Sequence, residues 1–186
     1  MALTQARLKK PLLLLVLAVT LFLIYANGLN TPFQSDDERH IFLNLEIDNP
    51  AYYLNPEKIT STALQYRQIS LLTFALNYKW GQENPFGYHL FNVLIHICTV
   101  ILVFIIVSLT IKNATEWGEK GASTIAIITA LLFGLHPVQT ETVTYISGRP
   151  GGMAALFFLL SLLMFILGGL KNSSRNIPSF IFHTLS

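Results

Sequence analysis

The chain has 186 residues, of which 52% are hydrophobic and only 12% are charged, and its mean hydropathy is +0.52. Ordinary globular domains carry roughly 25% charged residues, so the composition excludes a soluble domain and indicates a membrane protein. The net charge is +2 and the basic residues are scattered singly, which disfavours a nucleic-acid partner. A single cysteine, Cys98, excludes an intrachain disulfide and is expected to be a small buried side chain.

The amino-terminal segment is expected to be the first membrane span. Three basic residues precede a leucine-rich apolar run that ends at Ala26, which is the pattern of a secretory signal. Cleavage requires a small residue two positions before the last one, and Ile24 stands there. Residues 1–27 are therefore predicted to be an uncleaved signal anchor.

Three further apolar runs are predicted to cross the membrane, because about 20 apolar residues span its hydrocarbon core. They occupy residues 88–111, 122–145 and 153–170. A last run over residues 177–186 is too short to cross. We interpret it as the start of a truncated fifth helix, which predicts that the chain is a fragment; an interfacial carboxy-terminal helix is the alternative.

Residues 28–87 form a polar segment between the first two spans, with several Asn-Pro turn signals. Two pieces of it, residues 36–47 and 60–80, are predicted to be helical. The second has few charges, which favours a helix lying on the membrane surface. The predicted apolar side of that helix consists of Leu64, Ile69, Leu72, Phe74 and Leu76. The predicted fold class is all-α, a polytopic membrane helix bundle, partly GT-C-like, with an amphipathic-helical outer loop.

Charge assigns the loops to the two sides of the membrane. The amino end and the loops after the second and fourth spans hold seven Lys and Arg, whereas the only other short loop, a predicted tight turn over residues 146–152, holds Arg149 alone. Positively charged loops stay in the cytoplasm. The amino terminus is therefore predicted to be cytoplasmic, in a multi-pass protein of the bacterial inner membrane or the endoplasmic reticulum membrane. Glycosylation acceptor sequences at Asn113 and Asn172 are then chance matches.

Three successive acids, Asp36, Asp37 and Glu38, stand where the first span meets water. Ser35 with Glu38 three residues later also forms a capping box, and acids are favourable in the first turn of a helix. The chemical and the capping interpretations are compatible, because successive helical residues point about 100° apart. Spacing does not rank Asp36 above Asp37.

His136 and Pro137 interrupt the third span, because proline removes a backbone donor and clashes with the preceding turn. We expect a kink that opens polar backbone. Glu141 follows. At membrane depth it would be a functional candidate, and the alternative is that the segment has already entered water.

The second span carries His89, Asn92 and His96 on one helical face. No carboxylate accompanies them at ligand spacing, so interhelical hydrogen bonding is favoured over metal binding. Arg39, Arg67 and Arg149 are predicted to lie on the outer side, where an arginine can contact phosphate with two hydrogen bonds. For any one of them taken alone, contact with water or a lipid headgroup is the simpler interpretation.

Several motifs occur in an order that resembles a known family. They are DDERHIFLN, YRQISLLTFALNY, NPFGYHLFNVLIH and LLFGLHPVQTETVTYISGRPGGMAALFFLLSLL. Together they are similar to the amino-terminal membrane half of GT-C glycosyltransferases that carry tetratricopeptide repeats, the transmembrane protein O-mannosyltransferases and their bacterial relatives.

The resemblance implies an inverting glycosyltransferase that moves a sugar such as mannose from a polyprenyl-phosphate donor to a protein or glycan hydroxyl, on the lumenal or periplasmic side. Asp36 and Asp37 match the family's catalytic position, where one aspartate acts as general base. Arg67 and Arg149 match arginines expected at the donor phosphate. The expected supporting residues are Glu38, Arg39, His89, His136 and Glu141. No cofactor and no metal site are predicted, and metal dependence is left open.

The chain departs from the family pattern at two places. Gln68 stands where proline usually follows the arginine, and Pro150 stands where an acid or polar residue usually follows the SGR turn. The sequence also holds no helical repeats of about 34 residues, so enzymatic activity is predicted for a full-length parent. The alternative hypothesis is a non-catalytic membrane binding or assembly module, or an inactive remnant of the enzyme.

Overall fold

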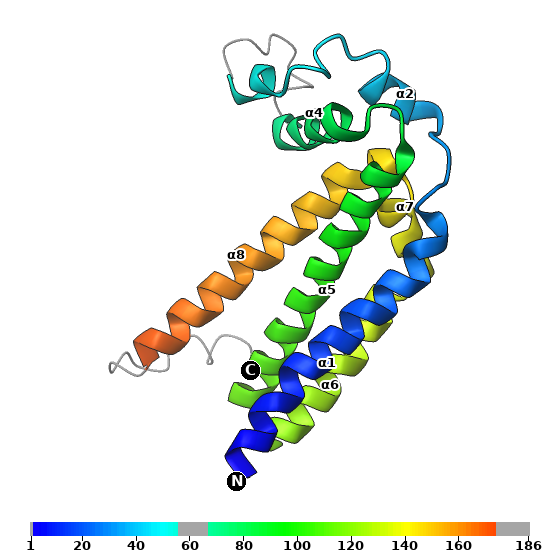
Figure 1. Cartoon of the computed structure of the whole chain (residues 1–186). Coiled ribbons are helices and arrows are strands. Elements are labelled where there is room, and N and C mark those ends of the chain that lie inside the picture. The colour runs from blue at the N-terminus through cyan, green and yellow to red at the C-terminus, as the bar shows by residue number, and fades with distance from the viewer. Residues whose placement is uncertain (1, 56–66, 174–186) are drawn as a thin grey trace.

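The computed structural model describes residues 2–55 and 67–173, and every regular element within them is helical (Figure 1). Three segments are long and apolar enough to cross a membrane, and a bent pair makes a fourth if it counts as one span. The predicted all-α helix bundle is confirmed. In chain order the helices are α1 (Ala2–Tyr25), η1 (Ala26–Gly28), α2 (Ser35–Ile41), η2 (Pro50–Leu54), α4 (Gln68–Gly81), α5 (Pro85–Ala114), α6 (Gly118–Gly134), η4 (Pro137–Gln139), α7 (Thr140–Val143), η5 (Ile146–Gly148) and α8 (Arg149–Ser173).

Helix α5 is the centre of the bundle and packs against α1, α6 and α8 (Figure 1). On α6 a stripe of small residues is buried at every fourth position: Ala122, Ala126, Ala130 and Gly134. Small residues at this spacing let helix backbones approach closely. The three membrane helices α1, α5 and α6 therefore form one tightly packed group.

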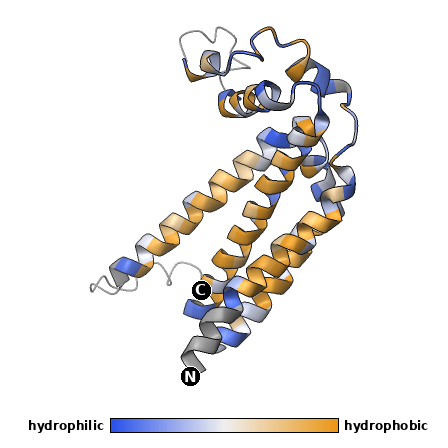
Figure 2. Ribbon diagram, in the orientation of Figure 1, coloured by the Kyte–Doolittle hydropathy of each residue, from blue (hydrophilic) through white to orange (hydrophobic). Residues whose placement is uncertain are grey.

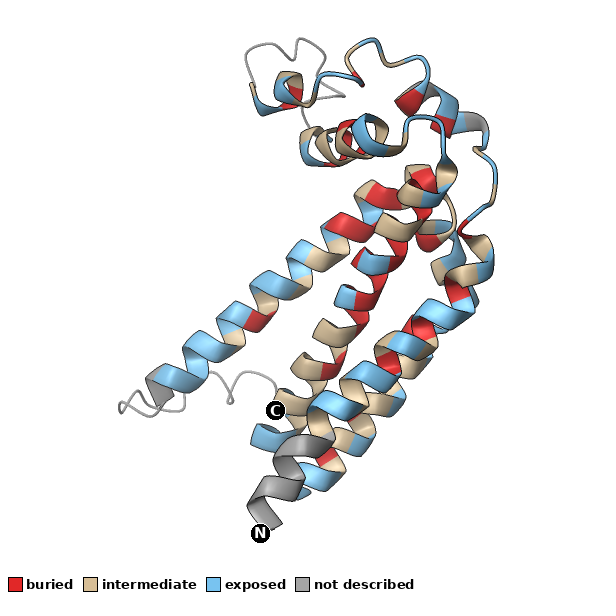
Figure 3. Ribbon diagram, viewed as in Figure 1, coloured by how far each residue is buried: buried red, intermediate tan, exposed pale blue. Residues whose placement is uncertain are grey.

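Helix α8 meets α5 near its own amino-terminal end and diverges from it further along (Figure 1). Much of α8 is both apolar and exposed (Figures 2 and 3); Phe158, Met164 and Phe165 are each more than 60% exposed. Such a surface is typical of a helix that faces lipid or other helices. Cys98 is likewise exposed. The expectation of a buried thiol is wrong, because its side of α5 points out of the bundle.

The third span is broken at His136-Pro137, as predicted, and Pro137–Val143 leaves α6 at an angle of 53°. The Val138 N–H donates to His136 Nδ1 at 3.2 Å and not to the preceding helical turn. The Gly134 carbonyl, freed by the break, accepts from the Tyr25 hydroxyl at 3.0 Å and from His96 Nε2 at 2.9 Å. Side chains from α1 and α5 thus satisfy the open backbone.

An outer layer formed by α2, η2 and α4 covers one end of the spans and has its own core, which includes Ile41, Tyr53, Phe74 and Tyr88. On α4 the buried positions are Ser70, Leu71, Phe74 and Ala75. The predicted apolar side was therefore right for Phe74 and wrong for Ile69, which is 58% exposed; Leu64 lies outside the described residues. The error arises because α4 packs against η2 and α5, and these partners select its buried side.

The segments that were predicted to share the basic side of the membrane do lie together. Lys10 Nζ is 2.6 Å from Glu119 Oε1, which joins the start of the apolar span in α1 to the beginning of α6. The ends of α5 and α8 lie at the same end of the bundle, opposite to α2 and α4 (Figure 1). The grouping of the loops thus agrees with the charge pattern.

Replacing Gly134 with Ala is expected to lower the melting temperature, because the new Cβ would lie 2.9 Å from Leu21 Cδ2 and 3.0 Å from Val100 Cγ2. Overpacking of this kind costs about 1–3 kcal/mol. Gly168→Ala is the matched control, since a Cβ there meets nothing within 4 Å. Thermal unfolding in detergent measures both variants, and an unchanged Tm for Gly134→Ala would contradict the close packing.

Candidate functional site

The carboxylate of Asp37 is buried and holds three hydrogen bonds, and the residue is 1% exposed. One oxygen accepts from the Ser147 N–H at 2.9 Å and from the Ser147 hydroxyl at 2.5 Å, and the other accepts from the Gln34 N–H at 2.9 Å. A buried carboxylate is costly unless such partners satisfy it. Asp37 therefore fastens α2 to the turn before α8, 110 residues further along the chain.

The start of α2 differs by one residue from the predicted capping box. Gln34 occupies the cap position in extended backbone, and Asp37 reaches back to the cap N–H. The prediction that Glu38 would make this bond is wrong, because the helix begins one residue earlier; Glu38 is exposed. The side chains of Ser35 and Arg39 lie outside the described part.

Asp36, in contrast, is exposed and faces a hollow of about 380 Å³. The hollow is lined mainly by polar groups, and Glu141 and Tyr145 contribute to its wall. Burial raises the pKa of the Tyr145 phenol, and its hydrogen bond to Asp36 and the charge of Asp36 raise that pKa further. The phenol thus stays a proton donor to Asp36, which keeps the carboxylate oriented while it remains open to water.

Arg149 is the first residue of α8 and is 1% exposed. Its Nε donates to Asn92 Oδ1 at 2.8 Å, Nη1 donates to Thr73 Oγ1 at 3.0 Å and Nη2 donates to the Tyr88 carbonyl at 3.0 Å. The guanidinium carbon also lies 4.2 Å from the ring centre of Phe74, within the range of a cation–π contact. Arg149 therefore joins α8 to both α4 and α5.

The predicted tight turn over residues 146–152 is wrong in its second half. The 3₁₀ turn Ile146–Gly148 leads directly into α8, because Pro150 stands in the first helical turn, where its missing N–H costs nothing. Gly148 is required here, since a Cβ would lie 2.5 Å from the Glu141 carbonyl oxygen. The short turn thus brings Ser147 and Arg149 to their partners in fixed positions.

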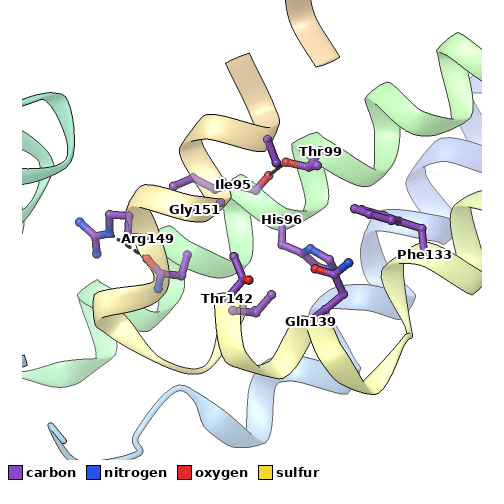
Figure 4. A pocket seen from close by; sticks show the side chains of 12 residues that line it. Ile95, His96, Thr99, Phe133, Gln139, Thr142, Arg149 and Gly151 are labelled. Atoms are coloured by element: carbon purple, nitrogen blue, oxygen red, sulfur yellow. Dashed lines mark hydrogen bonds between the residues drawn. The ribbon is translucent and has the colours of Figure 1, made fainter. Parts of the chain in front are cut away.

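A second hollow, of about 170 Å³, lies where α5, α7 and α8 meet. In Figure 4 the rings of His96 and Phe133 and the side chain of Gln139 lie on one side of it, whereas Arg149 extends away towards α4. His96 also donates to the Gly134 carbonyl. The hollow is mainly apolar and lies within the spans.

Side chains on the polar face of α5 form hydrogen bonds with backbone carbonyls where other segments leave regular structure. His89 Nε2 donates to the Thr31 carbonyl at 2.9 Å, and Asn92 Nδ2 donates to the Tyr145 carbonyl at 3.1 Å. The predicted hydrogen bonds from this face to other segments are therefore present. Across the described residues no group of three or more His, Cys, Asp or Glu side chains is placed to hold a metal ion.

Comparison with known proteins agrees with the motifs. Protein O-mannosyl-transferase TMTC2 of Homo sapiens is 34% identical over 152 residues, which are 77% of this chain, and TMTC4 of Mus musculus is 31% identical over 164 residues, which are 80% of it. The predicted resemblance to transmembrane O-mannosyl-transferases is therefore confirmed. The chain spans only 17% of the first relative and 22% of the second. No family model matches the chain, and no solved structure matches it.

The predicted site residues differ in how exposed they are in the structure. Asp36 and Glu141 line one open hollow, and Arg67 is exposed at the start of α4. Arg149 and Asp37 are enclosed. His136 is exposed and holds the Val138 N–H. The catalytic and phosphate-binding roles of these residues stay predictions.

Several partners in this region were missed from the sequence. They are Thr73 and Tyr88 beside Arg149, and Tyr145 and Ser147 around the two aspartates. Asn92 and Phe74 were singled out from the sequence, but not as partners of Arg149. The aromatic pair Tyr88 and Phe91, three residues apart at the start of α5, was the one available signal for a cation. The other partners come from segments that are distant in sequence.

Replacing Arg149 with Lys is expected to destabilise the protein by about 1–3 kcal/mol, because one ammonium group cannot serve three acceptors in the directions of a guanidinium and leaves buried acceptors unpaired. Arg67→Lys is the matched control, since Arg67 is exposed. Thermal unfolding in detergent compares the two. Equal loss of stability in both variants would contradict the enclosed position of Arg149.

Proposed function

We propose that the chain is the amino-terminal part of a membrane glycosyltransferase that transfers mannose from a polyprenyl-phosphate donor to a hydroxyl of a polypeptide, on the lumenal or periplasmic side. Its similarity to the TMTC protein O-mannosyl-transferases supports the reaction class. Because the chain spans only 17% and 22% of two of these relatives, the complete activity is assigned to the full-length protein.

The proposal depends on the contrast between the two aspartates. Both oxygens of Asp37 are engaged by backbone or hydroxyl donors, and the residue is buried. Asp36 is the exposed carboxylate, and it faces the polar hollow beside Glu141. We therefore assign Asp36 as the general base and Asp37 as the residue that positions the helix bearing it.

In this reaction Asp36 takes the proton of the acceptor hydroxyl as the hydroxyl oxygen attacks the anomeric carbon of the donor. The bond between that carbon and the lipid phosphate oxygen breaks, the configuration inverts, and the lipid phosphate leaves with the electron pair. A positioned base contributes about 10²- to 10⁴-fold to such a step. The hydrogen bond from Tyr145 supports Asp36 in the required orientation.

Arg67 is the better candidate for the departing phosphate. It is exposed at the start of α4, and a guanidinium suits phosphate oxygens. Arg149 donates to Thr73 of the same helix, so its enclosed position supports a role in holding α4. The alternative function, a headgroup-binding module that uses both arginines, is not favoured by the burial of Arg149.

The amino terminus is proposed to be cytoplasmic, which leaves Asn113, in the last turn of α5, unglycosylated. Expression in cells that glycosylate proteins, followed by treatment with a glycosidase, is expected to leave the electrophoretic mobility unchanged. An Asn-X-Ser acceptor made by Leu43→Asn with Leu45→Ser, two exposed positions between α2 and η2, serves as the outer-side control and should add one glycan. Glycan on Asn113 would overturn the orientation.

Asp36→Asn is expected to lower the rate of mannosyl transfer by about 10²- to 10⁴-fold, since an amide cannot accept the proton, without lowering the melting temperature. Asp37→Asn is expected to destabilise the protein by about 1–3 kcal/mol, since it leaves buried donors poorly matched. Both variants are made in the full-length protein. Transfer is assayed in membranes with a polyprenyl-phosphate mannose donor and a serine-containing peptide.

The two measurements together separate catalysis from folding. Undiminished transfer by Asp36→Asn, with normal protein levels, would remove the catalytic assignment of this residue. A loss of transfer in Asp37→Asn that is proportional to the loss of folded protein would agree with its positioning role.

A further inference from the structure

Two hollows adjoin at the water-facing end of the bundle. The hollow that Asp36 lines and a third hollow, of about 420 Å³, share Gln34, Thr140 and Thr144 in their walls. The third hollow continues past His136 to Asn27, in η1 just after α1. Each falls within the range of about 300–1,000 Å³ that is common for ligand sites. We refer to the combined depression as the outer trough.

We propose that the outer trough binds the acceptor polypeptide as an extended segment and presents its hydroxyl to Asp36. This inference rests on the proposed function and names the substrate surface of the same site. The trough runs along the bent segment from His136 to Thr144, which holds a 3₁₀ turn and a short α turn. At about 1.5–2 Å per residue the eight steps rise about 12–16 Å. Since an extended chain advances about 3.3 Å per residue, the trough accommodates about four or five acceptor residues.

The wall of the trough offers uncharged hydrogen-bonding groups in a row. His136 Nδ1 accepts the Val138 N–H, so the neutral ring carries its proton on Nε2 and offers a donor. The hydroxyl groups of Thr140 and Thr144 donate to the Pro137 and Thr140 carbonyls, which leaves their oxygens as acceptors. A donor followed by acceptors, one helical turn apart, suits the alternating N–H and C=O groups of a peptide.

Charge favours a peptide over the lipid-phosphate donor in this trough. The described lining residues include the carboxylates of Asp36 and Glu141 and include no Lys or Arg. Phosphate oxygens would therefore meet negative charge without a compensating cation, which is unfavourable. Arg67, the proposed phosphate residue, is absent from both described walls. The donor phosphate is thus expected to bind outside the trough.

The trough exists because the third span is broken. The 53° bend at Pro137 turns Thr140 and Thr144 out of the helix line of α6. Gly28 lets the chain after α1 pass close by, since a Cβ there would lie 3.2 Å from Thr144 Cγ2. The bend and the close approach together bring polar and apolar side chains of both segments to the same depression.

The test uses the full-length protein in membranes and two variants of one residue. Thr140→Val removes an acceptor oxygen and is expected to raise the KM for a serine-containing octapeptide by about two- to tenfold, the effect of one hydrogen bond, with the KM for the polyprenyl-phosphate mannose donor unchanged. Thr140→Trp is expected to fill the trough and abolish peptide binding. The matched controls are Thr124→Val and Thr124→Trp, because Thr124 is an exposed threonine that makes the same type of backbone bond outside the trough.

Binding is also measured without turnover, by photo-crosslinking the octapeptide with a benzophenone group to the protein in the absence of donor. Wild type and both Thr124 variants are expected to be labelled equally, and Thr140→Trp is expected to lose the label. Equal labelling and equal peptide KM in folded Thr140→Trp would overturn the trough as the acceptor site. Loss of label in Thr140→Trp together with full transfer by Asp36→Asn would instead overturn the assigned base and leave the trough standing.

Discussion

The arrangement of the outer layer depends on hydrogen bonds that converge on the short turn between α7 and α8. The Asp37 carboxylate accepts hydrogen bonds from Ser147. The Arg149 guanidinium donates to Thr73, Asn92 and the Tyr88 carbonyl. Two charged groups removed from water are stable only with all these partners in place. The positions of α2, α4 and α5 are consequently coupled, although long stretches of sequence separate them.

The polar residues of α5 satisfy a second physical requirement. Backbone groups within a membrane need hydrogen-bond partners from the protein. His89, Asn92 and His96 serve the carbonyls of Thr31, Tyr145 and Gly134 respectively. Each of these carbonyls lies where a segment leaves its helix. A span with three polar residues is therefore compatible with lipid, because its polar groups support the irregular segments that shape the hollows.

The sequence was sufficient for features that depend on local composition. Apolar length predicted the spans, Pro137 predicted the break, and charge predicted which loops lie together. It was insufficient where a side chain finds its partner far along the chain. Spacing could not separate the exposed Asp36 from the buried Asp37, because Ser147, which binds Asp37, lies 110 residues away. The buried side of α4 was likewise set by its packing against η2 and α5. The sequence pattern of a surface helix carries no information about these partners.

Gly148 gives the turn an additional property. The Ser147 hydroxyl serves α2, the Arg149 guanidinium serves α4 and α5, and Gly148 between them leaves no room for a side chain beside the Glu141 backbone. One inserted or deleted residue would rotate everything after it by about 100° and take one of the two groups away from its partners. The triplet thus sets the rotational phase of α8 relative to the outer layer, and the chain can change length in its loops but not here.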